Sequence, residues 1–262
     1  MTELLYQDKL LNLVSGYSLD TFPHSILLVG PLGCGKHTLL NIIQKKLNIP
    51  LEDITNHLTY DYLLDLSIRT SPYLYVIEAS QLTVRQQNII LKFLEEATNN
   101  AFIVLLSNHD NLLDTILNRC QILTFKKYTS EMLLTFLPVG VPEDIVQYCE
   151  TPAEVINFNS QEFDNLLRLI NKIVDEIDHA SIHSILSIVD FISFSDSSAG
   201  FTLNQFIKVL RKLLLDKYIT TKDITYSKMF MVLETSLSNL LLPNIDSKRI
   251  FECFLLDLKM CV

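Results

Sequence analysis

The amino-acid sequence predicts an α/β domain with a parallel sheet, followed by a small helical lid and a C-terminal helical domain. Three observations lead to this prediction. In the first half of the chain, short apolar runs alternate with segments of helical periodicity. The strand patterns stop after about residue 127, and short helical segments follow. From about residue 161 to the last residues, apolar side chains recur at helical spacing.

Four apolar runs in the first half are expected to form the sheet. Each is apolar at nearly every position, which is typical of strands that are covered on both faces, as in parallel sheets. The segments between these runs show helical periodicity, so strands and helices are expected to alternate. The expected strands cover 26–29, 73–77, 101–106 and 122–125, and the expected helices cover 39–47, 84–96 and 112–118.

The second half of the chain is expected to be helical. A stripe from Phe163 to Ile177 repeats apolar side chains at alternating spacings of four and three residues, which places them on one face of a helix. A polar segment at 193–200 is expected to be a loop. Further helices are expected over 130–137, 142–149, 204–218, 227–241 and 247–260. The predicted domains are an α/β domain of nucleotide-binding type at 1–127, a helical lid at 128–160 and a helical domain at 161–262.

Composition excludes several classes of protein. The chain has 262 residues, of which 48% are hydrophobic and 19% charged, so it is not largely disordered. Its 21 Lys and Arg against 30 Asp and Glu give a formal net charge of −9, which disfavours a nucleic-acid binder that acts alone. Five dispersed cysteines without a C-x-x-C pair indicate neither a zinc site nor a disulfide framework. Because no signal peptide and no membrane-spanning apolar run are evident, a cytoplasmic protein is expected.

A glycine-rich turn follows the first expected strand and opens the first expected helix. Residues 30–38 have the sequence GPLGCGKHT and contain three of the six glycines of the chain. In a phosphate loop, glycines let backbone N–H groups face a bound phosphate, the helix dipole adds positive potential, and the lysine reaches the outer phosphate oxygens. ATP or ADP could therefore occupy this loop. The candidate nucleotide-binding residues are Gly30, Gly33, Cys34, Gly35, Lys36, His37 and Thr38.

Two positions of this motif lack the residues that hold Mg²⁺. The residue after Lys36 should be Ser or Thr, yet it is His37, and Thr38 follows one residue late. The second apolar run has Ile77 where an Asp ligand is expected, and Glu78 follows. Glu78 is either a retained catalytic carboxylate or an exposed residue at the end of a strand. The sequence thus predicts phosphate binding with impaired Mg²⁺ binding and without hydrolysis.

Together these motifs resemble the AAA+ subunits of DNA polymerase clamp loaders. The resemblance rests on the phosphate loop and on the segments 78–83 (EASQLT), 88–96 (NIILKFLEE) and 112–121 (LLDTILNRCQ). It covers about residues 20–125 and fades beyond them. Within this family the chain is most similar to the δ′ subunit of bacterial DNA polymerase III, whose own ATP site is commonly degenerate. The chain departs from the family at Glu154, where its ATPases place a sensor arginine, and in the zinc module, which is missing.

The resemblance assigns roles to two further residues. Arg119 occupies the place of an arginine finger that reaches the ATP of a neighbouring subunit, whereas an arginine judged alone would be a surface ion pair. Ser107 lies near the position at which this family has a residue that contacts phosphate or water. The alternative is that Ser107 only caps a turn at the end of its strand. No metal site is expected elsewhere in the chain.

The resemblance implies a subunit of an ATP-dependent clamp loader that has no ATPase activity of its own. Its helices at 161–262 would join a collar in a hetero-oligomeric ring, and the complex would load the sliding clamp onto primed DNA. One alternative is an ATP-hydrolysing motor subunit that uses Lys36, Thr38 and Glu78. A second is a P-loop kinase of small substrates, which would need a basic lid where this chain has an acidic one.

Overall fold

The computed structural model describes residues 4–96, 100–109, 112–177, 179–186, 189, 192–193, 201–240 and 247–261. The chain divides into two compact units, Met1–Asn157 and Phe158–Val262. The first unit is an α/β fold and the second is mostly helical. The predicted fold class, a parallel α/β domain followed by helices, is therefore confirmed.

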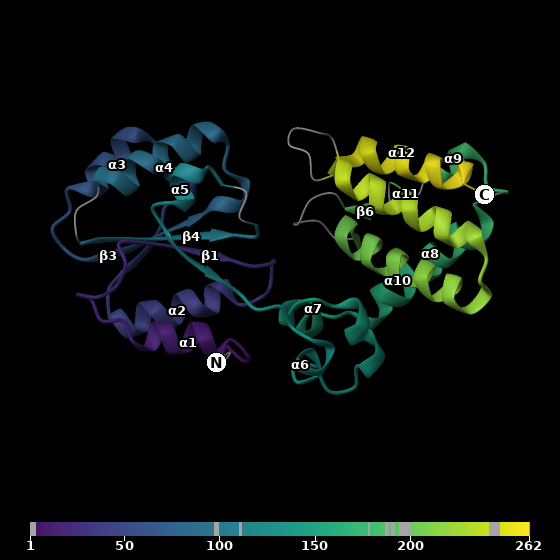
Figure 1. Cartoon of the computed structure of the whole chain (residues 1–262), viewed down its shortest axis with the longest axis horizontal. Helices are drawn as coiled ribbons and strands as arrows, with labels where there is room; N and C mark the ends of the chain where they lie inside the picture. Colours follow the sequence, from purple (N-terminus) through teal and green to yellow (C-terminus); the bar gives the residue numbers. More distant parts are fainter. Residues whose placement is uncertain are drawn as a thin grey trace. The chain divides into compact units, whose positions relative to one another are not determined.

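A five-stranded sheet forms the centre of the first unit, in the order β2-β3-β4-β1-β5 (Figure 1). Every residue of β1 and β4 is buried, as expected of apolar strands that are covered on both faces. All strand pairings in this sheet are parallel, so the carboxyl ends of the strands lie at one edge. The strands are β1 (Ser25–Val29), β2 (Leu51–Asp53), β3 (Tyr73–Glu78), β4 (Ala101–Ser107) and β5 (Gln121–Thr124).

Helices cover both faces of the sheet (Figure 1). On one face lie α1 (Asp8–Ser15) and α2 (Lys36–Leu47), and on the other lie α3 (Tyr60–Ser67), α4 (Val84–Glu96) and α5 (Asp114–Leu117).

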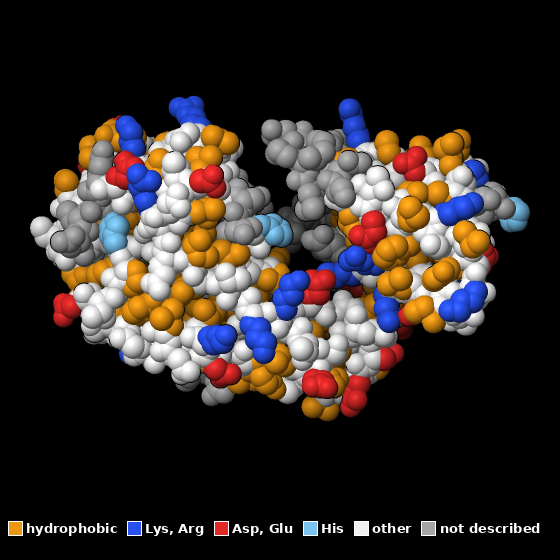
Figure 2. All heavy atoms as spheres, in the orientation of Figure 1, with side chains coloured by type: hydrophobic (Ala, Val, Ile, Leu, Met, Phe, Trp, Pro, Cys, Tyr) orange, Lys and Arg blue, Asp and Glu red, His pale blue; other side chains and the backbone are white. Residues whose placement is uncertain are grey.

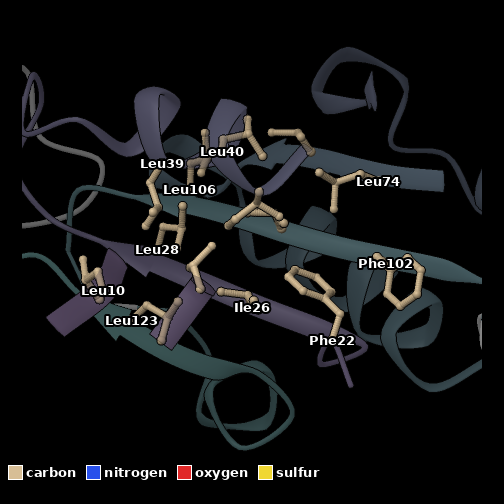
Figure 3. Close-up of a cluster of buried hydrophobic side chains, with 14 of the residues drawn as sticks. Leu10, Phe22, Ile26, Leu28, Leu39, Leu40, Leu74, Phe102, Leu106 and Leu123 are labelled. Atoms are coloured by element: carbon tan, nitrogen blue, oxygen red, sulfur yellow. The ribbon is translucent and has the colours of Figure 1, made fainter. Parts of the chain in front are cut away.

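Successive side chains of β1 point to opposite faces of the sheet, as the strand period of two requires. Ile26 and Leu28 pack in the apolar cluster with α1 and α2 (Figure 3). Leu27 and Val29 pack in a second cluster with α3, α4 and α5. One central strand therefore anchors both helical layers.

One strand and two α-helices of the first unit were not predicted from the sequence. Strand β2 has three residues, two of them the acidic Glu52 and Asp53, and it lies at the edge of the sheet, so no apolar run marks it. Helices α1 and α3 have eight residues each, which is too few turns for helical periodicity to be distinct. Helix α2 begins three residues earlier than expected, because its first turn, Lys36 to Thr38, is polar.

Short helices follow the sheet and belong to the first unit. They are α6 (Ser130–Leu134), a 3₁₀ helix (Glu143–Tyr148) and α7 (Pro152–Ile156). The hydroxyl of Thr129 accepts the backbone N–H of Met132 and caps α6. Because the chain divides in two near residue 157, the three domains proposed from the sequence remain a prediction.

The second unit consists mainly of five helices among the described residues. Of the predicted stripe in α8, Ile170, Val174 and Ile177 are buried. Phe206 of α10 meets Phe251 of α12 edge to face, with ring centroids 5.1 Å apart. The helices are α8 (Ser160–Glu176), α9 (Ile182–Leu186), α10 (Leu203–Thr221), α11 (Ile224–Leu240) and α12 (Ser247–Met260).

The second unit is not entirely helical, in contrast to the prediction. Two short strands, β6 (Ile192–Ser193) and β7 (Phe201–Thr202), pair in parallel. The loop expected at 193–200 lies outside the described residues except for Ser193, which belongs to β6. In the part of the chain that the structure describes, no helix is both long and apolar enough to span a membrane.

The burial pattern of β1 can be tested with one pair of substitutions. Leu27 and Ile122 are register partners on β1 and β5, but Leu27 is fully buried whereas Ile122 is 44% exposed. We expect Leu27→Ala to lower the free energy of unfolding by about 2–5 kcal/mol, because it leaves a cavity. Ile122→Ala should cost about 1 kcal/mol, because much of that side chain already meets water. Urea denaturation followed by circular dichroism measures both, and equal losses would contradict the burial described.

Candidate functional site

The glycine-rich turn lies between the carboxyl end of β1 and the first residue of α2. Gly33 and Gly35 have φ angles of +83° and +107°, in the left-handed region that glycine adopts without strain. Gly35 is the N-cap residue of α2 and has no side chain to cap the helix. Backbone N–H groups at such a helix start are suited to bind an anion. The strand, loop and helix that a phosphate loop requires are therefore all present.

A second segment of the chain packs against this loop. A Cβ atom added to Gly33 would lie 2.6 Å from the Cβ of Ala153 and 2.8 Å from the hydroxyl oxygen of Thr151. The backbone N–H of Ala153 donates to the carbonyl oxygen of Gly33 at 3.4 Å. The Tyr128 hydroxyl donates to the carbonyl oxygen of Cys34 at 3.0 Å. The glycine at position 33 is therefore required by close packing as well as by its φ angle.

Lys36 is almost completely buried, and protein oxygens surround its ammonium group. Its Nζ atom donates to the carbonyl oxygens of Gly30 and Pro31, at 2.5 and 3.1 Å, and to Oδ1 of Asn108 at 2.9 Å. Burial lowers the pKa of Lys36, and the nearby Cys34 and Glu78 act in the opposite direction. A phosphate group that binds Lys36 would have to displace some of these oxygens from the ammonium group.

The structure brings the side chain of Asn108, and not that of Ser107, to the phosphate loop. Ser107 is fully buried, and its hydroxyl donates to the carbonyl oxygen of His109 at 2.6 Å. Asn108 is held by its backbone N–H, which donates to the Ser80 hydroxyl at 2.9 Å, while its side chain accepts from Lys36. The sequence offered one signal for Asn108, because it is an amide directly after a buried strand.

Two residues at the degenerate positions of the motif are in contact with each other. His37 Nε2 lies 2.9 Å from Glu78 Oε1, with 70% and 39% of the two side chains exposed. Glu78 is the last residue of β3, and its backbone N–H donates to the Thr55 hydroxyl at 2.9 Å. Thr38 is half-buried in the first turn of α2. The imidazole therefore lies against the carboxylate of Glu78, the candidate catalytic residue.

Ile77 faces the other side of the sheet from His37. It is fully buried in the apolar cluster that β1 shares with α3, α4 and α5. In the register of β3 with β4, Ile77 pairs with Leu105 and Glu78 with Leu106. Leu106 belongs to the cluster on the α2 side, so Glu78 is the β3 residue directed toward the phosphate loop.

The residues present do not fit the Mg²⁺ ion that a motif of this kind holds. Mg²⁺ requires oxygen ligands in octahedral geometry, whereas His37 supplies nitrogen and Ile77 supplies no ligand. The remaining carboxylate, Glu78, is bonded to His37. Within the described ranges, no three His, Cys, Asp or Glu side chains gather as a metal site.

Arg119, the predicted finger, lies just beyond α5 and contacts α4 and α5. Its Nη2 atom lies 2.6 Å from Oε1 of Glu95, and its Nη1 atom donates to the carbonyl oxygen of Thr115 at 2.9 Å. The Ser25 hydroxyl donates to the carbonyl oxygen of Arg119 at 2.5 Å and fixes the backbone at the start of β1. About 40% of the Arg119 side chain remains exposed.

Comparisons with known proteins support the clamp-loader family that the motifs resemble. A family model described as "DNA polymerase III, delta subunit" matches residues 49–129, which include Glu78 and Arg119 but not the phosphate loop. A solved structure of a DNA polymerase III gamma subunit-related protein from Thermotoga maritima is similar with a TM-score of 0.50 and 14% sequence identity. That match covers 97% of this chain and 98% of the other, and it shows the fold alone. No curated protein matches the sequence.

The packing of the lid segment on the loop can be tested at two glycines. Gly33 and Gly140 both have positive φ, but a Cβ at Gly140 would meet no atom within 4 Å. We expect Gly140→Ala to cost about 1 kcal/mol of unfolding free energy, from left-handed strain alone. Gly33→Ala should cost more, because its new methyl group would overlap Ala153. The double variant Gly33→Ala with Ala153→Gly should recover part of the loss, and equal costs at both glycines in urea denaturation would contradict this contact.

Proposed function

We propose that this chain is a δ′-like subunit of a DNA polymerase clamp loader that does not hydrolyse ATP itself and supplies Arg119 to the ATP site of a neighbouring subunit. One observation carries the proposal. The phosphate loop keeps its glycines and Lys36, while its metal position is occupied by the contact between His37 and Glu78. The loop geometry is thus retained without the groups that hold Mg²⁺.

Loss of the metal position argues against hydrolysis in this chain. In phosphoryl transfer, Mg²⁺ bridges the β- and γ-phosphate oxygens and neutralises the charge that develops there. Glu78 would have to leave His37 before it could help to hold such an ion. Glu154, on the first turn of α7, adds a negative charge where a motor subunit would have a cation.

Arg119 is suited to act on a partner because little free energy holds it in its present contact. An exposed ion pair such as that with Glu95 contributes at most about 1 kcal/mol. An arginine finger accelerates hydrolysis by about 10³–10⁵-fold, which corresponds to roughly 4–7 kcal/mol of transition-state stabilisation. The guanidinium can therefore leave Glu95 for a neighbour's γ-phosphate with a large net gain.

The helices of the second unit are the proposed contact with other subunits. Figure 2 shows hydrophobic side chains over the visible face of this unit. Ile219 of α10, Met231 of α11 and Met260 of α12 are 61%, 66% and 85% exposed. The net charge of −9 makes binding of DNA by this chain alone unfavourable, so DNA and the clamp would be bound through the complex.

The finger assignment predicts a loss of ATP turnover at the neighbouring subunit. In a loader complex purified through a tag on this chain, Arg119→Ala should lower turnover at that site by about 10³-fold, because the transition-state charge loses its partner. Clamp loading should fall with it. Arg69→Ala is a matched control in the first unit, since it also removes one guanidinium and one ion pair, that with Glu52 at 2.7 Å. Unchanged turnover with Arg119→Ala would exclude Arg119 as a finger.

The alternative of a motor subunit makes the opposite prediction for the isolated chain. With the metal position blocked, we expect the purified chain to show no Mg·ATP turnover above background. Phosphate release measured with and without the substitution Lys36→Ala tests this. Turnover that Lys36→Ala abolishes would favour a motor subunit that uses Lys36, Thr38 and Glu78.

A further inference from the structure

We propose that the contact between His37 and Glu78 takes the place of the divalent cation at this phosphate loop, so that the loop binds a nucleoside di- or triphosphate in metal-free form. The inference deepens the proposed function, because it concerns the ligand of the same loop. It does not depend on Arg119.

The first argument is the position of the two side chains. His37 is the second residue of α2 and follows Lys36 directly, at the place of the missing hydroxyl ligand. Glu78 ends β3 and is the residue of that strand directed toward α2. Their side chains meet at 2.9 Å, so the imidazole lies where a metal ion would join helix and strand.

The second argument concerns charge. A carboxylate beside bound phosphates repels them, and in an ordinary site Mg²⁺ screens this repulsion. His37 can serve the same purpose, because its N–H group engages the Glu78 carboxylate directly.

The third argument is that the groups which bind phosphate do not need a metal ion. Lys36 and the N-terminus of α2, which has no side-chain cap, are in place, and the positive φ angles of Gly33 and Gly35 shape the loop. Thr151 supplies an independent observation, since it is 1% exposed and its hydroxyl has no hydrogen-bond partner in the described structure. This hydroxyl lies beside Gly33, and a buried hydroxyl without a partner is costly unless a ligand or water satisfies it.

The test is a fluorescence titration of the full chain with N-methylanthraniloyl-ADP, in millimolar MgCl₂ or in EDTA. For the natural sequence we expect the two dissociation constants to agree within about threefold. His37→Ser frees Glu78 and supplies a hydroxyl ligand, so Mg²⁺ should tighten binding by that variant by roughly tenfold or more. His183→Ser, on an exposed position of α9, is the matched control and should behave as the natural sequence.

Several results would overturn the inference. One is that Mg²⁺ strengthens nucleotide binding by the natural sequence tenfold. Another is that the natural sequence does not bind the nucleotide in EDTA. A third is that Mg²⁺ does not change the dissociation constant of the His37→Ser variant. Should His37→Ser fail to fold, Glu78→Gln gives a second test, because it removes the charge that His37 screens. In EDTA the Glu78→Gln variant should bind the nucleotide at least as tightly as the natural sequence does. Weaker binding by this variant would contradict the inference. A requirement for Mg²⁺ would overturn this inference and leave the test of Arg119 intact.

Discussion

The burial of β1 between β4 and β5 is the constraint on which the rest of the first unit depends. All five residues of β1 are buried, and the strand is in parallel register with both neighbours. Parallel pairing brings the carboxyl ends of β1, β3 and β4 to one edge of the sheet. The phosphate loop, Glu78 and Asn108 all leave the sheet there. The sheet therefore assembles the site from segments that are distant in the sequence.

Two side chains at the start of α2 each have a partner within the protein. Lys36 donates to three oxygens, and His37 meets Glu78. A buried ammonium group without partners would be very costly, so these contacts allow the loop to keep its shape without a ligand. Arg119 differs from the buried Lys36, because its side chain is partly exposed and its ion pair is weak. Lys36 is thus held firmly within the chain, whereas the contact of Arg119 with Glu95 is weaker.

The close approach of the lid segment adds a structural purpose to the phosphate loop. Thr151 and Ala153 pack directly on Gly33, and Tyr128 donates to the carbonyl oxygen of Cys34. The loop therefore joins the sheet to the helices that follow it. A chain that no longer uses metal chemistry at this site would still require these glycines, since any side chain at position 33 would displace the lid segment.

The sequence by itself determined the alternating strands and helices and the glycine-rich turn between the first strand and its helix, because apolar runs and glycine spacing are local properties. It did not reveal β2, α1 or α3, which are too short for a periodic signal. Only the tertiary structure decided that Glu78 faces His37, that Ile77 faces the opposite apolar cluster, and that Asn108 rather than Ser107 reaches Lys36. These contacts join residues from different strands, and strand order and register, which no local pattern encodes, bring them together.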